Sequence, residues 1–360
     1  MDPIKVLIVD DSPFMRMVLK DIIDQQPDMK VIAIAKDGEE AVEKVLSLKP
    51  DVITLDIEMP RKNGLEALTE IMQKFPTRVI MVSSLTSKDA DITIECLEKG
   101  AFDFIQKPAG STSWTFRDVQ DELLKKIRES INVPIEKLKA LHFLERQKIK
   151  KRTNFNIIGQ KIVLIASSTG GPRSLDTIIT QLPENLNVPV IIVQHMPPGF
   201  TKSLADRLDK ISNLKVKEAE DGELLQRNVV YVAPGDYHLG LKQDAHKIKL
   251  FLDKSEKINN VRPSADFTFD LASEIFKENT LAAILTGMGR DGAKGAFKVK
   301  HYGGKVIAES KETCVVYGMP KIVVEEGYAD FVLPNYQIPS KIVELLSKNS
   351  GGESSEYKSK

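Results

Sequence analysis

Acidic residues stand at the ends of two short apolar runs in the N-terminal third of this 360-residue chain. Asp10 and Asp11 follow one run, and Asp56 ends another. Three carboxylates at one edge of a parallel sheet repel one another unless a cation neutralises them, and Mg²⁺ prefers such oxygen ligands. Ser83 and Lys107 end two later runs, where a hydroxyl and an ammonium group could stabilise a phosphoryl group carried by an aspartate. Alternatively, these acidic residues cap helices or face solvent.

A second candidate for chemistry is the stretch IASSTGGPRS at 165–174, between an apolar run and a helical pattern. It lacks the lysine of a Walker-type phosphate loop and the glycine spacing of a dinucleotide-binding loop. Only half of the nucleophile elbow G-x-S-x-G is present, since Ala166 precedes and Gly170 follows Ser168 by two residues. Gly170 and Gly171 permit a tight turn into a helix, whose N-terminus favours developing negative charge. Ser168 is a candidate nucleophile, unless the loop merely turns the chain.

A serine nucleophile needs a base and an acidic partner for that base. His195 ends an apolar run in IIVQHMPPGF, and His238, after APGDY, is the second candidate base. Asp291 follows an apolar run and a glycine-rich turn in LTGMGRDGA, where it could equally cap a helix. Because all three run ends should share one sheet edge, Ser168, His195 and Asp291 together predict a triad. The order Ser, His, Asp is no objection, since the same geometry occurs with several chain orders.

The elements that must position these residues form two separate α/β patterns. In the first, short apolar runs alternate with helical periodicity, which predicts a doubly wound parallel sheet of five strands. These runs lie at 4–11, 31–35, 52–56, 78–84 and 103–108.

The second pattern predicts a mostly parallel, three-layer α/β domain, which the candidate triad would make the hydrolase domain. Its flanking runs include 161–167, 188–196, 281–287, 304–309 and 330–334. The stretch 228–252 is typical of an antiparallel, hairpin-like insert, which would make the sheet mixed.

The two patterns divide the chain into domains at 1–122 and 158–346. Between them, 123–157 predicts a helical linker with one strongly basic face, which is either a solvated surface or a site for an acidic partner. The tail at 347–360 has few core-forming residues and is expected to be disordered.

Composition excludes several classes of function. Lys and Arg together number 51, as do Asp and Glu, so no bulk attraction to nucleic acid or to an anionic membrane is expected. Two distant cysteines favour a reduced cytoplasmic setting over a disulfide framework. No apolar stretch approaches the roughly 20 residues that span a bilayer. We also expect a monomer, because no long apolar helix seam is visible.

Residues 1 to about 122 resemble the receiver domain of bacterial response regulators through VDDS, LDIEMPRKNG, MVSS and QKP. The resemblance implies that Asp56 accepts a phosphoryl group. It also implies a Mg²⁺ site and a set of phosphoryl contacts, formed by Asp10, Asp11, Asp56 and the Glu58 backbone, and by Ser83 and Lys107. Phe104 stands about where many receivers carry a switching aromatic residue, although it could equally be a core residue.

The second domain resembles the CheB family of chemotaxis protein-glutamate methylesterases, through ASSTGGP, QHMPPGFT, APGDYH, VRPSADFTF and LTGMGRDGA. By that resemblance Ser168 is the nucleophile, His195 the general base and Asp291 its orienting partner. The resemblance also places residues at the oxyanion or substrate, namely Thr169, the Met288 backbone N–H, Arg262 and Ser264. The implied reactions are hydrolysis of glutamyl methyl esters on chemoreceptors and deamidation of receptor glutamines.

The family arrangement implies a phosphorylation-regulated hydrolase with a chemotaxis histidine kinase as phosphodonor and no cofactor in the catalytic site. Two rivals are a response regulator with a DNA-binding output domain and one with a non-catalytic docking module. Neutral charge, the absence of a helix-turn-helix pattern and the intact triad residues argue against both.

Overall fold

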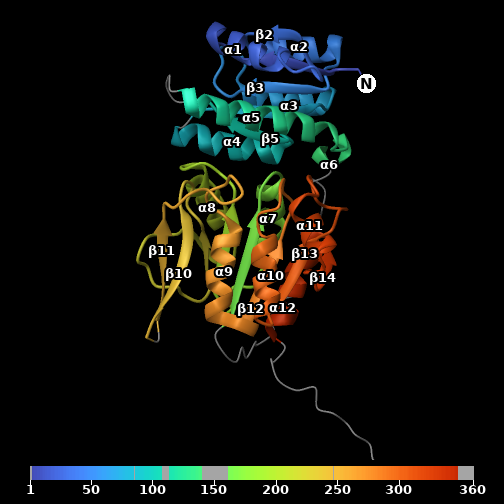
Figure 1. The fold of residues 1–360 in the computed structure, drawn as a ribbon. Helices are drawn as coiled ribbons and strands as arrows, with labels where there is room; N and C mark the ends of the chain where they lie inside the picture. The colour runs from blue at the N-terminus through green and yellow to red at the C-terminus, as the bar shows by residue number, and fades with distance from the viewer. Residues whose placement is uncertain (1, 85, 108–112, 140–160, 246, 348–360) are drawn as a thin grey trace, which may run out of the picture.

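The computed structural model describes residues 2–84, 86–107, 113–139, 161–245 and 247–347, which form two α/β domains (Figure 1). The predicted fold class, two doubly wound domains with parallel sheets, is confirmed. Most of the predicted linker, at 140–157, and the tail at 348–360 lie outside the described residues. The predicted boundary at 122 falls within the helix α5 (Ser113–Ile131).

The N-terminal domain is a parallel sheet with the strand order β2-β1-β3-β4-β5. Its strands are β1 (Ile4–Val9), β2 (Met29–Ala35), β3 (Val52–Asp56), β4 (Arg78–Ser83) and β5 (Asp103–Gln106). Besides α5, its helices are α1 (Pro13–Asp24), α2 (Gly38–Leu48), α3 (Gly64–Lys74) and α4 (Ser87–Lys99), and α6 (Ile135–Lys139) follows them. Local signals fix the helix starts: the Ser12 side chain caps α1, and Asn63 forms a capping box with Glu66 at α3.

The C-terminal domain is built on a seven-stranded parallel sheet of order β14-β13-β12-β6-β7-β9-β8. Its strands are β6 (Ile162–Ser167), β7 (Val190–Gln194), β8 (Lys215–Glu218), β9 (Val229–Val232), β12 (Thr280–Ile284), β13 (Lys305–Glu309) and β14 (Phe331–Leu333). The predicted mixed sheet is wrong in one respect. The antiparallel pair β10 (His238–Asp244) and β11 (Lys247–Asp253) forms a separate two-stranded sheet.

Helices cover both faces of this sheet, giving three layers. Alternate residues of β6 point to opposite faces. Val163 and Ile165 pack with α7 (Gly171–Ile179), α8 (Phe200–Ile211) and α12 (Ile338–Ser347). Leu164 lies in the second core with α9 (Ala265–Phe276), α10 (Ala293–His301) and α11 (Met319–Glu325). The described 3₁₀ turns are η2 (Lys277–Asn279) and η3 (Asn335–Gln337). This packing fixes the strand ends that carry the candidate site.

The N-terminal domain sits on the carboxyl edge of the C-terminal sheet, with α4 and β5 on the covered side (Figure 1). Phe104 of β5 stacks on Phe200 at the start of α8, with ring centroids 4.6 Å apart. The Arg173 guanidinium, 6 % exposed, donates to the backbone oxygens of Leu97 and Ala101. The two domains therefore share a packed, largely desolvated interface.

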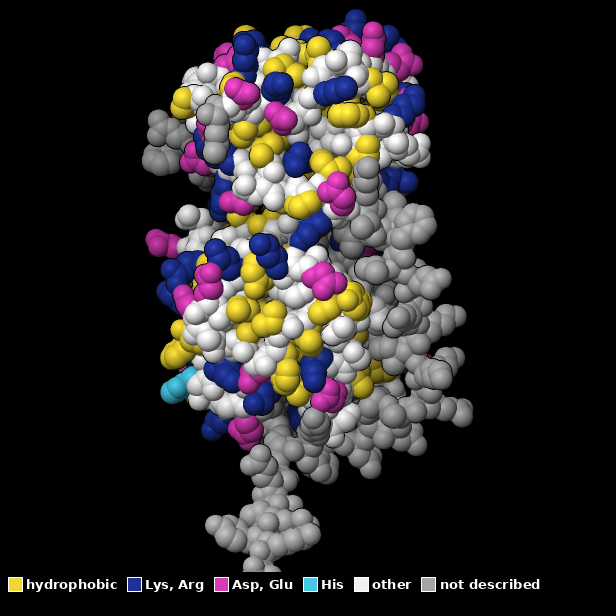
Figure 2. Space-filling view, turned by 90° about the vertical axis from the view of Figure 1, so that its right-hand side faces the viewer, with side chains coloured by type: hydrophobic (Ala, Val, Ile, Leu, Met, Phe, Trp, Pro, Cys, Tyr) yellow, Lys and Arg dark blue, Asp and Glu magenta, His cyan; other side chains and the backbone are white. Residues whose placement is uncertain are grey.

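Charges of both signs are interspersed over both domains on the face shown in Figure 2. This distribution agrees with the formal net charge of zero. On this face the described residues form no broad basic patch for a polyanion.

Candidate functional site

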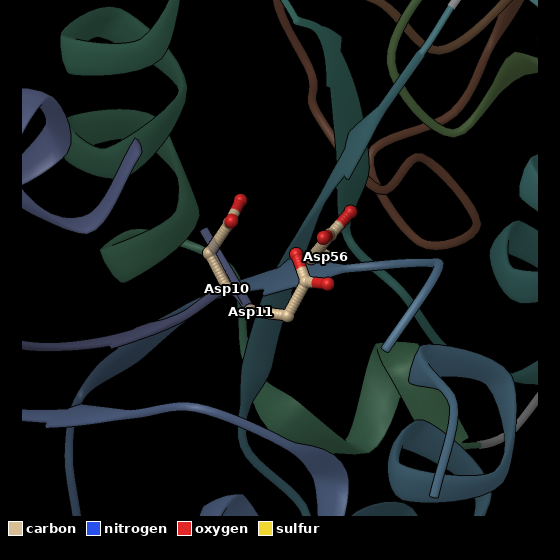
Figure 3. A group of neighbouring side chains, drawn as sticks. All are labelled: Asp10, Asp11 and Asp56. Carbon is tan, nitrogen blue, oxygen red and sulfur yellow. The ribbon is translucent and has the colours of Figure 1, made fainter. Parts of the chain in front are cut away.

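An acidic pocket lies at the carboxyl ends of β1 and β3 (Figure 3). Asp10 and Asp56 are buried and Asp11 is exposed, and the three carboxylates offer oxygen atoms that all lie within 4.8 Å of one another. Lys107 Nζ lies 3.1 Å from Asp10 Oδ2 and 2.8 Å from Asp56 Oδ2. The described residues that line the pocket are Asp11, Asp56, Ile57, Glu58, Ser84, Asp89 and Lys107.

The electrostatics of this pocket suit a divalent cation. Burial raises the pKa of Asp56 to about 6, with Lys107 opposing that rise and the charge of Asp10 adding to it. The Oδ2 atoms of Asp10 and Asp56 are buried, and among the described residues both face the single ammonium group of Lys107. Converging, under-satisfied carboxylate oxygens are the donor set that Mg²⁺ takes in proteins.

Of two further residues predicted for this pocket, Glu58 lines it and Ser83 does not. Glu58 lines the pocket, and its exposed side chain pairs with Lys88 at 3.6 Å. Ser83 is fully buried, and its hydroxyl donates to the Ser84 backbone oxygen and accepts from Thr93. Ser84, which the sequence did not single out, lies in the pocket wall instead.

The second site lies at the carboxyl ends of three adjacent strands of the larger sheet, β12, β6 and β7. Ser168 directly follows β6, in a turn where Gly170 has φ 78° before α7 begins. His195 directly follows β7. Asp291 lies between β12 and α10. Adjacent parallel strands thus bring together the serine, the histidine and the aspartate that the sequence singled out.

Asp291 holds the His195 ring through a buried contact of 2.8 Å between Oδ2 and Nε2. Its carboxylate also accepts hydrogen bonds from the Ser264 hydroxyl and the Ala265 N–H, both at 2.6 Å, and from Asn259 Nδ2 at 2.9 Å. Burial opposes ionisation of Asp291, but His195, Ser264 and the Ala265 N–H together lower its pKa to about 2. Asp291 is therefore a fixed negative charge at neutral pH.

The two neighbouring serines are in different environments. The Ser167 hydroxyl is fully buried and donates to Gln194 Oε1 at 2.6 Å. Ser168 is half-buried, its N–H donates to the Thr286 backbone oxygen, and its hydroxyl makes no hydrogen bond within the described part of the chain. Because His195 Nε2 faces Asp291, the ring nitrogen left for the serine is Nδ1. Only Ser168 combines access with an uncommitted hydroxyl.

His238 does not stand beside the serine. It is fully buried, accepts a hydrogen bond from the Ser264 N–H at Nδ1, and contacts the Glu256 backbone oxygen through Nε2 at 3.0 Å. Both ring nitrogens are engaged, so His238 cannot serve as the base, and it instead supports Ser264.

The residues predicted to bind the oxyanion or the substrate have the following contacts. The Thr169 hydroxyl donates across the interface to Asp103. Met288 is half-buried against the cluster that the N-terminal domain shares with Val315 and Val316. Arg262 is held by Asp236 Oδ1, at 2.5 Å, and by the backbone oxygens of residues 254 and 255.

Comparison with known proteins agrees with this geometry. Residues 163–342 match the family described as CheB methylesterase, and residues 6–114 match the response regulator receiver domain. A protein-glutamate methylesterase/protein-glutamine glutaminase of Thermotoga maritima is 65 % identical over 95 % of this chain and 98 % of its own. The chain belongs to the CheB methylesterase family.

Further relatives of this CheB family member agree. The protein-glutamate methylesterase/protein-glutamine glutaminase of Pyrococcus horikoshii is 47 % identical over 97 % of this chain and 95 % of its own. The crystal structure of the Thermotoga maritima CheB methylesterase catalytic domain is 68 % identical, covers 52 % of this chain and 100 % of its own, and has a TM-score of 0.52.

Both resemblances stated from the sequence are thereby confirmed: the chain is a receiver domain joined to a methylesterase domain. A DNA-binding or non-catalytic output domain is not favoured. No described helix is both long enough and apolar enough to cross a membrane.

Sequence reasoning missed the residues that support the triad rather than form it. Gln194 holds the Ser168 backbone oxygen at 3.0 Å, and Thr286 accepts from the Ser168 N–H. Asn259 reaches Asp291 from a turn far away in sequence. Gln194 and Thr286 stand beside the predicted strand ends, so their positions in the sequence could have indicated a role near the triad. Nothing in the sequence near Asn259 indicates such a role.

Proposed function

We propose that Ser168, His195 and Asp291 are the catalytic triad that hydrolyses glutamyl methyl esters on chemoreceptors, and that deamidates glutamines at the same site. The observation that carries this proposal is the buried 2.8 Å contact between Asp291 and His195 on strand ends adjacent to the uncommitted Ser168 hydroxyl. A glutamine amide presents the same carbonyl as the ester, so both substrates suit one site.

The reaction follows from these roles. His195 takes the Ser168 proton at Nδ1 while the serine oxygen attacks the ester carbonyl, and Asp291 stabilises the imidazolium that forms. The carbon–oxygen bond to methoxide then breaks, and His195 returns the proton so that methanol leaves. Water repeats these steps on the acyl-serine and releases the glutamate side chain.

Charge that develops on the carbonyl oxygen needs donors. The serine lies just before the N-terminus of α7, where the helix dipole favours negative charge. We assign the oxyanion side to the Met288 backbone N–H and the Thr169 region, with Arg262 and Ser264 nearby. Ser264 acts through Asp291, to which its hydroxyl donates.

In the receiver we propose Asp56 as the phosphoacceptor and a chemotaxis histidine kinase as the phosphodonor. Asp10, Asp11 and Asp56, with the Glu58 backbone, would hold Mg²⁺, which supplies positive charge against the phosphoryl oxygens. Lys107 pairs with Asp56 and would meet one of those oxygens. Ser83 is assigned to another, which requires its buried hydroxyl to leave the Ser84 backbone oxygen. We assign no cofactor to the hydrolase site.

Phosphorylation would control access to the triad. In the structure the receiver covers the sheet edge that carries Ser168 and His195. Phe104 stacks on Phe200, the Arg173 guanidinium donates to receiver carbonyl oxygens, and Asp103 accepts a hydrogen bond from the Thr169 hydroxyl. Phosphorylation would loosen this docking by the difference in affinity between the two receiver conformations. We place the protein in the cytoplasm, as a monomer.

Methanol release from methylated receptor membranes tests the catalytic proposal. Ser168→Ala should abolish nearly all release, with or without a phosphodonor. Ser167→Ala is the matched control: it loses only the hydrogen bond to Gln194 and should retain most of the activity. An inactive Ser167→Ala variant beside an active Ser168→Ala variant would move the nucleophile by one residue and refute the assignment.

A further inference from the structure

One donor to Asp291 lies outside the strand ends that form the triad. Asn259 Nδ2 donates to Asp291 Oδ1 at 2.9 Å and to Asp266 Oδ2 at 2.8 Å. An amide nitrogen carries two hydrogens, so one can serve each carboxylate. Asn259 therefore bridges two buried aspartates, one of which holds His195.

The turn that presents this amide is well defined. Ile258 and Val261 exchange backbone hydrogen bonds of 3.2 and 3.0 Å, which closes a two-residue turn. Both central residues have positive φ, 54° at Asn259 and 63° at Asn260. Type I′ turns require that conformation, and asparagine tolerates it better than most residues. The backbone thus holds the Asn259 amide over the carboxylates.

The two carboxylates need such a donor between them. Asp266 is 7 % exposed and Asp291 2 %, and burial together with the charge of Asp291 raises the pKa of Asp266. The Gly295 N–H holds the other oxygen of Asp266. The hydrogen bond from Asn259 opposes that rise, so the amide stabilises Asp266 beside the charge of Asp291.

We propose that Asn259 is a positioning residue of the hydrolase: its amide spans and shields the two carboxylates, and keeps Asp291 turned toward His195. The inference rests on the proposed triad. Without the amide, the repulsion between the two carboxylates would be unrelieved and would turn Asp291 away from the His195 ring that it orients. Oδ1 of Asp291 would also lose one of the bonds that fix its orientation.

The test compares Asn259→Gly with Asn260→Gly in the full chain activated by a phosphodonor. Glycine accepts positive φ, so both changes preserve the turn, and only the first removes the amide. We expect Asn259→Gly to lower kcat about 10-fold at pH 7 with little change in KM, the loss typical of one hydrogen bond to a charged group. Asn260→Gly should behave like wild type.

A second readout does not depend on substrate. In Asn259→Gly, the NMR signals of the His195 ring should shift and broaden, because the contact between Nε2 and Asp291 is no longer fixed as firmly. Asn259→Asp, of the same shape, should move them at least as far. In the double variant Asn259→Gly/Asp266→Asn the shift should shrink, because one of the two charges is gone.

The outcomes separate the two proposals. Unchanged NMR signals of the His195 ring and an unchanged kcat in Asn259→Gly would overturn the role of the amide, and equal effects in Asn260→Gly would assign them to turn flexibility instead. A wild-type chain that releases no methanol would refute the proposed function. In that case the NMR signals of the His195 ring would still decide whether Asn259 holds Asp291 against that ring.

Discussion

Arg173 offers a direct test of whether receiver docking restrains the enzyme. It lies on α7, five residues after Ser168, yet its guanidinium donates to the receiver backbone at Leu97 and Ala101. Burial lowers its pKa to about 10, which leaves it charged at neutral pH. Arg173→Ala would therefore remove two charge-assisted hydrogen bonds that exist only while the domains are docked.

The size of the effect follows from those two bonds. A hydrogen bond to a charged group contributes about 1.5–3 kcal/mol net, so the lower value for both gives about 3 kcal/mol of docking free energy. Since about 1.4 kcal/mol is a factor of ten, the docking constant should fall more than 100-fold. The measured gain in activity is smaller if the undocked form is already populated, and its upper limit is the activity of a receiver-free fragment.

The assay is methanol release by the unphosphorylated full chain. Arg173→Ala should raise basal activity toward that of a 153–360 fragment and should reduce the further stimulation by a phosphodonor. Arg227→Ala, at an exposed position of the same domain, is the control and should change neither. The Thermotoga maritima catalytic domain has been crystallised by itself, so the fragment is a reasonable reference.

Three results would refute the reasoning. Unchanged basal activity in full-length Arg173→Ala would mean that these bonds do not hold the receiver in place. A fragment that loses activity on the same substitution would mean that Arg173 acts in catalysis or substrate binding. A fragment less active than the unphosphorylated full chain would reject inhibition by docking altogether.

Further predictions concern Asp56 and the triad. Asp56→Asn should block labelling by a small phosphodonor and abolish activation, and chelation of Mg²⁺ should block labelling of wild type while basal methanol release continues. Because burial raises the pKa of Asp56 from 3.8 to about 6, metal-free wild type should lose about 3 kcal/mol of stability between pH 4 and 7, measured by urea unfolding. Asp56→Asn should not show that loss, and equal pH dependence in both proteins would contradict the raised pKa. His195→Ala combined with Ser168→Ala should cost little more activity than either alone, since the two residues act as a unit.

The strand ends were the most predictable part of the molecule. Apolar runs that end in Asp56, Ser167 or Gln194 show in the sequence because buried parallel strands must be apolar and their carboxyl ends must meet solvent or ligand. The alternation of runs and helices then fixes which edge the triad residues share. Nothing more than local pattern was needed for these predictions.

Other features depend on contacts between distant segments, which leave no local pattern. His195 directly follows β7 and His238 begins β10, and only the packing of Ser264 on His238 shows that the His238 ring is committed. The separation of β10 and β11 from the main sheet is a matter of tertiary packing, because an antiparallel hairpin has the same sequence pattern in either position. The hydrogen bonds from Asn259 to Asp266 and Asp291 likewise join distant segments, so the sequence does not predict them.

The four-residue strand β5 connects the two sites in physical terms. It is followed by Lys107, which pairs with Asp56, and it begins at Asp103, which accepts the hydroxyl of Thr169 beside the nucleophile. Asp103 also pairs with Lys126 at 3.3 Å, and this ammonium lies over the ring of Phe104. A phosphoryl group on Asp56 would compete for Lys107 and bias the position of β5.

The same strand contacts both catalytic loops. Asp103 binds the loop that follows β6, and Phe104 stacks on Phe200, five residues after His195. A packed ring and a buried hydrogen bond have few intermediate arrangements, so a small displacement of β5 should break these contacts rather than stretch them. Phosphorylation of Asp56, as proposed, would therefore release both the serine and the histidine loops through one short element.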